Sequence, residues 1–274
     1  MPTTTINGVD LYWEVLGQEG DPLVFVHGSW GDHYNWNGVV DELSKSFRVL
    51  TYDRRGHSKS ERPPGQGSTE EDIDDLVALV EYLNFAPAHI AGNSGGAAIV
   101  LKTAAKRPDI FKSLIVHEPP LFAVLKDVDE AQPMLEVVGA RIKAVVDLLI
   151  THEYEQAAKL FVETIAFGPG AWKELPDAIK QTFIFNAPTF LDEIRDPSNL
   201  EFDIASLSSF HNPALLTNGS ESPPFFTIAL NLISNGLPQA KRLEFKGAGH
   251  VPHLSHPEQY IQTIKQFCRT YEVV

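Results

Sequence analysis

The chain has 274 residues, 43% of them hydrophobic and 10% aromatic, which is enough to bury a sizeable core and too many for a disordered chain. Its 22 basic and 36 acidic residues give a net charge of −14, and the absence of a basic cluster excludes nucleic acid and anionic membrane surfaces as expected partners. Because Cys268 is the one cysteine, neither an intrachain disulfide nor a cysteine-based metal site is expected.

The first residues show neither the basic stretch nor the apolar core of a secretory signal. No apolar run approaches the roughly 20 residues that span a bilayer. We therefore expect a cytoplasmic, globular protein without membrane contact, monomeric or homodimeric, whose partner is a small-molecule substrate.

In the first part of the chain, short β-branched runs alternate with longer amphipathic stretches. The runs at 23–26 and 47–52 are apolar without alternation, as in strands that are covered on both faces. Residues 69–83 begin with acidic side chains, which a helix N-terminus favours, and continue with apolar side chains at helical spacing. A second predicted helix, 97–107, ends before Pro108. The alternation predicts an α/β fold with a mostly parallel sheet flanked by helices. The predicted strands are 11–15, 23–26, 47–52, 89–91 and 114–116.

From about residue 119 to residue 212 the strand pattern stops. Helical spacing continues over 136–150, 154–165 and 178–185. Strand-like runs resume at 214–216 and 243–245, and residues 260–271 predict a closing helix. The simplest account is a helical cap, residues 119–212, inserted into a core domain made of residues 1–118 and 213–274.

The motif G-x-S-x-G occurs at residues 92–96, between a predicted strand and a predicted helix. In that setting the glycines permit a tight turn, and Ser94 stands at its exposed apex as a candidate nucleophile. The N–H of Gly95, at the start of the helix, can bind a developing oxyanion. A second N–H is expected from Ser29 or Trp30, in the turn after the strand at 23–26.

The general base and the acid must come from later in the chain. His250 is the preferred base because neighbouring glycines let the chain swing its imidazole toward the serine, with His253 and His256 as alternatives. Two carboxylates follow predicted strands, Glu118 in a rigid Glu-Pro-Pro segment and Glu221 in a loop. Either can hold the imidazole tautomer. No metal and no cofactor is required.

Together these motifs resemble the α/β-hydrolase superfamily over nearly the whole chain, in the order nucleophile, acid, histidine. The resemblance rests on His27-Gly28, the segment 52–60, the Ser94 elbow and Gly249-His250. It implies an α/β-hydrolase fold with a helical cap between the sixth and seventh strands. A serine nucleophile rules out the chemistries of the dehalogenases and epoxide hydrolases, which use an aspartate.

The resemblance also bears on the choice of acid. Many family members carry an aspartate three residues past a glycine after the seventh strand, where this chain has Ser222. The segment His117-Glu118-Pro119 resembles zearalenone lactonase, in which the acid follows the sixth strand. This favours Glu118 over Glu221.

A cap in this family covers the active site, which implies an apolar lid that excludes water. Trp172, Phe183 and Phe190 of the cap are therefore predicted to bind substrate, together with Gly28 and Val251 of the core. The alternative is that the cap rings build the cap's own core.

The preferred hypothesis is a cofactor-free serine hydrolase for an ester or lactone of a small, largely apolar molecule. A second hypothesis keeps the same triad for hydrolysis of a carbon–carbon bond, and a third is a ligand-binding receptor on the same fold. The second would need a cation in the pocket to bind a substrate carboxylate. The cap offers Lys159, Lys173, Lys180 and Arg195.

Overall fold

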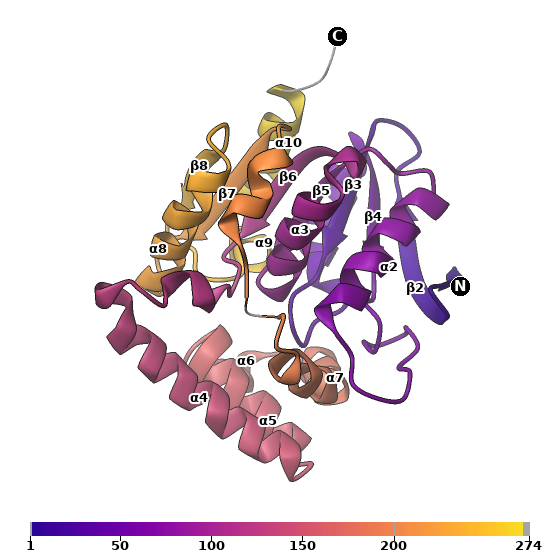
Figure 1. Ribbon diagram of the computed structural model, residues 1–274. Helices are drawn as coiled ribbons and strands as arrows, with labels where there is room; N and C mark the ends of the chain where they lie inside the picture. Colours follow the sequence, from indigo (N-terminus) through magenta and orange to yellow (C-terminus); the bar gives the residue numbers. More distant parts are fainter. Residues whose placement is uncertain (1, 200, 271–274) are drawn as a thin grey trace.

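An eight-stranded sheet runs through the molecule in the order β1-β2-β4-β3-β5-β6-β7-β8 (Figure 1). β1 and β2 pair antiparallel, as do β2 and β4, and all other neighbours are parallel, so the predicted mostly parallel sheet is confirmed. The structure is a computed structural model that describes residues 2–199 and 201–270. The predicted end of the closing helix, Tyr271, lies outside these ranges. The strands are β1 Thr3–Ile6, β2 Val9–Leu16, β3 Asp21–Val26, β4 Phe47–Tyr52, β5 Ala88–Asn93, β6 Phe111–His117, β7 Ala214–Gly219 and β8 Lys241–Phe245.

Helices cover both faces of this sheet, which explains why its central strands are apolar without alternation. One face carries α2 (Thr69–Tyr82), α3 (Gly95–Lys106) and α8 (Pro224–Ile233). The other carries α1 (Asn37–Leu43) and α10 (Pro257–Thr270). Pattern reading did not anticipate β1, α1 or α8. Within the described ranges, no helix has both the length and the apolar character needed to cross a bilayer.

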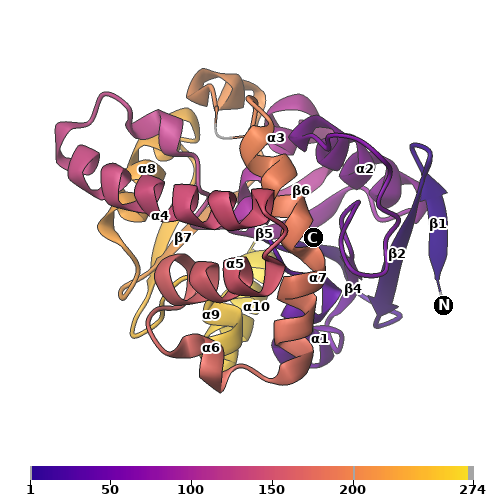
Figure 2. The same ribbon diagram turned by 90° about the horizontal axis from the view of Figure 1, so that it is seen from below.

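The segment between β6 and β7, here called the insertion (residues 118–213), is helical, as predicted. It lies below the sheet in Figure 1 and in front of it in Figure 2. A buried cluster of its own, which includes Phe161, Phe183 and Phe190, holds it together. Its main elements are α4 (Gln132–Ile150), α5 (Tyr154–Phe161), a π-helical turn (Val162–Ala166), α6 (Ala171–Glu174) and α7 (Asp177–Arg195).

Candidate active site

The turn from β5 into α3 places Ser94 in an unusual backbone conformation, with φ 55° and ψ −126°. The flanking glycines make this turn possible. A Cβ on Gly92 would lie 2.5 Å from the carbonyl oxygen of Gly96, and a Cβ on Gly96 would lie 2.2 Å from that of Val26. The sequence therefore forms the strand–turn–helix that the motif predicts, with Ser94 between β5 and α3.

The end of β6 and the loop after β8 meet at a hydrogen-bonded pair. His250 Nδ1 lies 2.6 Å from Glu118 Oε2, and Glu118 Oε1 accepts the N–H of Gly219 at 2.7 Å. Burial of Glu118 raises the pKa of its carboxyl, but the hydrogen bond with His250 and the adjacent His117 outweigh burial and lower that pKa to about 2. The carboxylate is ionised at neutral pH and accepts the Nδ1 proton, which leaves Nε2 of His250 free to act as a base.

The rival candidates lie elsewhere. Glu221 is an exposed loop residue that follows β7. His253 is buried against Trp36, with ring centroids 4.4 Å apart, and burial lowers its pKa to about 3. His256 is paired with the neighbouring Ser255. The structure thus pairs Glu118 with His250. Neither the alternative acid, Glu221, nor the alternative bases, His253 and His256, take part in this pair.

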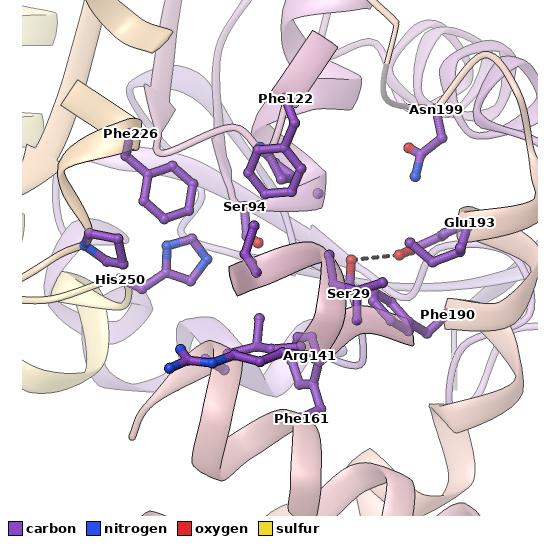
Figure 3. Close-up of a pocket in the computed structure, with 18 of the residues that line it drawn as sticks. Ser29, Ser94, Phe122, Arg141, Phe161, Phe190, Glu193, Asn199, Phe226 and His250 are labelled. Carbon is purple, nitrogen blue, oxygen red and sulfur yellow. Dashed lines mark hydrogen bonds between the residues drawn. The ribbon is translucent and has the colours of Figure 1, made fainter. Parts of the chain in front are cut away.

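Ser94 and His250 both line two adjoining cavities, of about 330 and 420 Å³. Figure 3 shows Ser94 between the ring of His250 and Ser29 at the wall of the first cavity. Phe226 stacks on His250, with centroids 5.0 Å apart and the planes inclined by 18°. The first cavity can therefore hold an apolar group beside Ser94. Its apolar wall includes Phe122, Met134, Val138, Ile142, Phe190 and Phe225.

The structure distributes the five predicted substrate-binding residues unevenly. Phe190 lines the first cavity, and Gly28, Phe183 and Val251 line the second. Trp172 lines neither of these two cavities. It is 9% exposed and belongs to the buried cluster of the insertion. The structure therefore does not support a substrate contact for Trp172, because its indole packs in the core of the insertion.

The two predicted N–H donors after β3 differ in their surroundings. A Cβ on Gly95 would lie 3.2 Å from the backbone nitrogen of Ser29, so Ser29 and the start of α3 face each other closely. Trp30 instead buries its indole in the insertion, stacked on Phe161 with centroids 4.8 Å apart. The side chain of Trp30 therefore anchors the insertion on the core. This role is independent of whether its backbone N–H binds an oxyanion.

Replacing Trp30 by alanine is expected to lower the free energy of unfolding by about 3 kcal/mol or more, because a fully buried indole leaves a cavity between the core and the insertion. Urea unfolding followed by circular dichroism would measure the change. Phe185→Ala is the control, since this ring of α7 is 65% exposed and its loss should change stability by less than about 0.5 kcal/mol. Equal midpoints for the two variants would contradict the anchoring role.

A buried ionic cluster lies at the polar end of the first cavity and was not found from the sequence. Glu193 of α7 accepts a hydrogen bond from Ser29 Oγ at 2.5 Å (Figure 3). It accepts a second one from Arg54 Nη2 at 2.7 Å. Arg54 Nη1 donates to Asp72 at 2.8 Å. Arg54 is 2% exposed, so these contacts tie the insertion to the core directly beside Ser29. No local pattern relates Glu193 to a serine 164 residues away.

The sheet order, the insertion and the elbow together define an α/β hydrolase fold. Residues 21–257 match the family model described as alpha/beta hydrolase fold, and the chain belongs to this family. It is 32% identical over 138 residues to an uncharacterized hydrolase, YraK, of Bacillus subtilis, a match that covers 49% of this chain and 51% of that protein. The chain thus matches about half the length of this relative.

Solved structures of the same fold cover nearly the whole chain. Est816, described as an N-acyl homoserine lactone degrading enzyme, is 21% identical with a TM-score of 0.75, covering 97% of this chain and 100% of its own. A thermophilic esterase from Thermogutta terrifontis is 23% identical with a TM-score of 0.72. The match covers 99% of this chain and 97% of the esterase. At these identities the likeness shows the fold alone.

Proposed function

We propose that this protein is a cofactor-free serine hydrolase that cleaves an ester or lactone of a small, largely apolar molecule through an acyl-enzyme. The observation that carries the proposal is the 2.6 Å contact between Glu118 and His250, next to an elbow serine in the wall of an apolar cavity. The names of the neighbours, a hydrolase, an esterase and a lactone-degrading enzyme, agree with it.

In this proposal Ser94 Oγ attacks the carbonyl carbon while His250 Nε2 takes its proton. Glu118 holds the tautomer of His250 and stabilises the imidazolium that forms. The N–H groups of Gly95 and Ser29 bind the oxyanion, with the N–H of Trp30 as the other candidate donor. His250 then protonates the leaving alcohol and activates a water molecule, which hydrolyses the acyl-enzyme.

A lactone is favoured over an acyclic ester by the resemblance of the His117-Glu118-Pro119 segment to zearalenone lactonase, and the lactone-degrading neighbour supports this choice. A lactone keeps both its acyl part and its alcohol part after ring opening. Two cavities that meet at Ser94 can take one part each.

One observation favours the carbon–carbon hydrolase as a second candidate. Arg141 of α4 lines the first cavity (Figure 3). Its Nη1 donates to the carbonyl oxygen of Thr164 at 2.8 Å. A guanidinium there can bind a substrate carboxylate. The four insertion cations that the sequence suggested line neither of the two described cavities.

The test is a search for the acyl-enzyme. A short p-nitrophenyl ester should give a burst of about one equivalent of nitrophenolate, and mass spectrometry of the quenched protein should find the acyl group on the peptide with Ser94. Ser29 is the internal control, since it lines the same cavity and should stay unmodified. Turnover with no acylated peptide would contradict the proposal. A panel of acyclic esters, lactones and carboxylate-bearing diketones then ranks the substrate classes.

A further inference from the structure

Three metal-ligating side chains meet beside the proposed nucleophile. His117, Glu118 and His250 each offer one ligand atom, and these three atoms all lie within 4.8 Å of one another. Glu118 Oε2 is 2.6 Å from His250 Nδ1 and 3.6 Å from His117 Nε2. The proposed mechanism uses Glu118 and His250 but leaves His117 without a role.

One ring nitrogen of His117 is hydrogen-bonded to a neighbouring hydroxyl. The hydroxyl of Thr217 donates to the carbonyl oxygen of Val116 at 3.0 Å, so it can accept from His117 Nδ1, which is 3.0 Å away. In the tautomer with the proton on Nδ1, the lone pair of Nε2 is free, and Nε2 lies 3.6 Å from Glu118 Oε2.

This Nε2 atom is buried, since His117 is 2% exposed, and it has no hydrogen-bond partner among the described residues. The backbone of Gly249 lies close to the ring and can accept a proton from it, so a proton on Nε2 has to move to Nδ1 when a cation binds there. A buried ring nitrogen that lies 3.6 Å from a carboxylate oxygen without a hydrogen bond to it is a place where a cation can bind.

We propose that His117, Glu118 and His250 form an inhibitory binding site for Zn²⁺, whose effect on turnover rests on the proposed function. Two imidazole nitrogens and one carboxylate oxygen are a set of three protein ligands that Zn²⁺ takes, with water in the fourth position. The Nδ1–H of His117 donates to Thr217, which is the outer contact that holds a metal-binding imidazole in place.

Two of the three ligand distances can be compared with those of a zinc site, and the third, between His117 and His250, is at most 4.8 Å. Zinc ligands at about 2.0–2.1 Å in a tetrahedron stand about 3.3 Å apart. The 3.6 Å between His117 and Glu118 is close to this value, whereas the 2.6 Å between Glu118 and His250 must lengthen by less than about 1 Å. His250 can move because it follows Gly247, at φ 74°, and Gly249 in a loop that opens to both cavities.

Zinc at this site would stop the reaction through the proton of His250. The ion forms a bond to Nδ1, and the proton that Nδ1 carried moves to Nε2, so no proton is gained or lost overall. A ring that is protonated on Nε2 donates toward Ser94 and cannot take the serine proton. Because the ion must pass the ring of His250, inhibition should develop slowly and reverse with a chelator.

A second cluster of ligand atoms, Asp32, His33 and Asp53, is also buried and is a useful contrast. His33 Nδ1 is bonded to Asp53 at 2.6 Å, and the ammonium of Lys59 lies 3.3 Å from His33 Nε2. Lys59 therefore already supplies a positive charge beside this second cluster. This second cluster is therefore not proposed as a site.

Binding is tested without substrate, by calorimetric titration of ZnCl₂ into the wild type, His117→Gln and His256→Gln. His256 lies outside the triangle, so its variant should bind like the wild type. His117→Gln should bind Zn²⁺ at least about tenfold more weakly, the scale on which altered metal surroundings reduce affinity. Equal affinity in all three proteins, or no binding to the wild type, would overturn the site.

Two further measurements test the ligand set and separate failure of the metal site from failure of the proposed function. Co²⁺ added to the wild type should give the intense visible absorption of a tetrahedral site, and a weak octahedral spectrum would contradict the proposed ligand set whether or not the variant folds. With an ester substrate, Zn²⁺ should inhibit the wild type slowly and EDTA should restore turnover. Zinc binding in a protein that turns over no ester would remove the proposed function and leave the metal site standing.

Discussion

Replacing Ser94 by alanine is expected to lower the turnover of a p-nitrophenyl ester by about 10⁴-fold or more, since no other group can form the acyl-enzyme. The cavities keep their shape, because the side chain loses one oxygen atom at their wall. The KM should therefore change much less than kcat. Steady-state kinetics over a range of substrate concentrations would measure both.

The matched control is Ser29→Ala. This substitution removes the hydroxyl that donates to Glu193 but keeps the backbone N–H that faces Gly95. Its turnover should stay within about tenfold of the wild type, because the lost hydrogen bond contributes about 1 kcal/mol. Wild-type turnover in Ser94→Ala would place the chemistry elsewhere.

Replacing Glu118 by glutamine is expected to lower kcat by about 10⁴-fold, while Glu221→Gln should leave it nearly unchanged. An amide of the same size can present an N–H to His250 Nδ1. The imidazole would then carry its proton on Nε2, where it cannot accept the proton of Ser94. Side-by-side ester kinetics measure the difference, with circular dichroism to verify the fold of both variants.

The opposite result would reassign the acid. A large loss in Glu221→Gln, with an active Glu118→Gln variant, would mean that the 2.6 Å contact with His250 is not the working one. Glu221 is exposed on the loop after β7, so that loop would have to rearrange for Glu221 to reach His250.

Local sequence signals were sufficient to predict the central strands of the sheet and the turn that carries Ser94. Apolar runs without alternation located the buried strands, and the glycines around Ser94 located the turn into α3. The ends of predicted strands located Glu118 and Glu221 as candidate acids, and the resemblance of the segment 117–119 to zearalenone lactonase favoured Glu118. These signals act over a few residues, which is why they could be read without knowledge of the tertiary structure.

Other features depend on packing between distant segments. Nothing near Trp172 shows that α6 directs its ring into the insertion, and nothing near Glu193 shows that it meets Ser29 and Arg54. The helix predicted at 178–185 extends as α7 to Arg195, with Pro188 inside it. Tertiary packing overrode the local helix-breaking tendency of proline there.

The conformation of Ser94 has a consequence for how this chain tolerates mutation. A residue with a Cβ atom at φ 55° and ψ −126° carries strain of about 1–3 kcal/mol, which glycine would largely avoid. The exchange that most relaxes the backbone at this turn is therefore one that deletes the hydroxyl. Selection for thermal robustness alone would favour glycine here, whereas the proposed function requires the hydroxyl of serine in spite of its cost in stability.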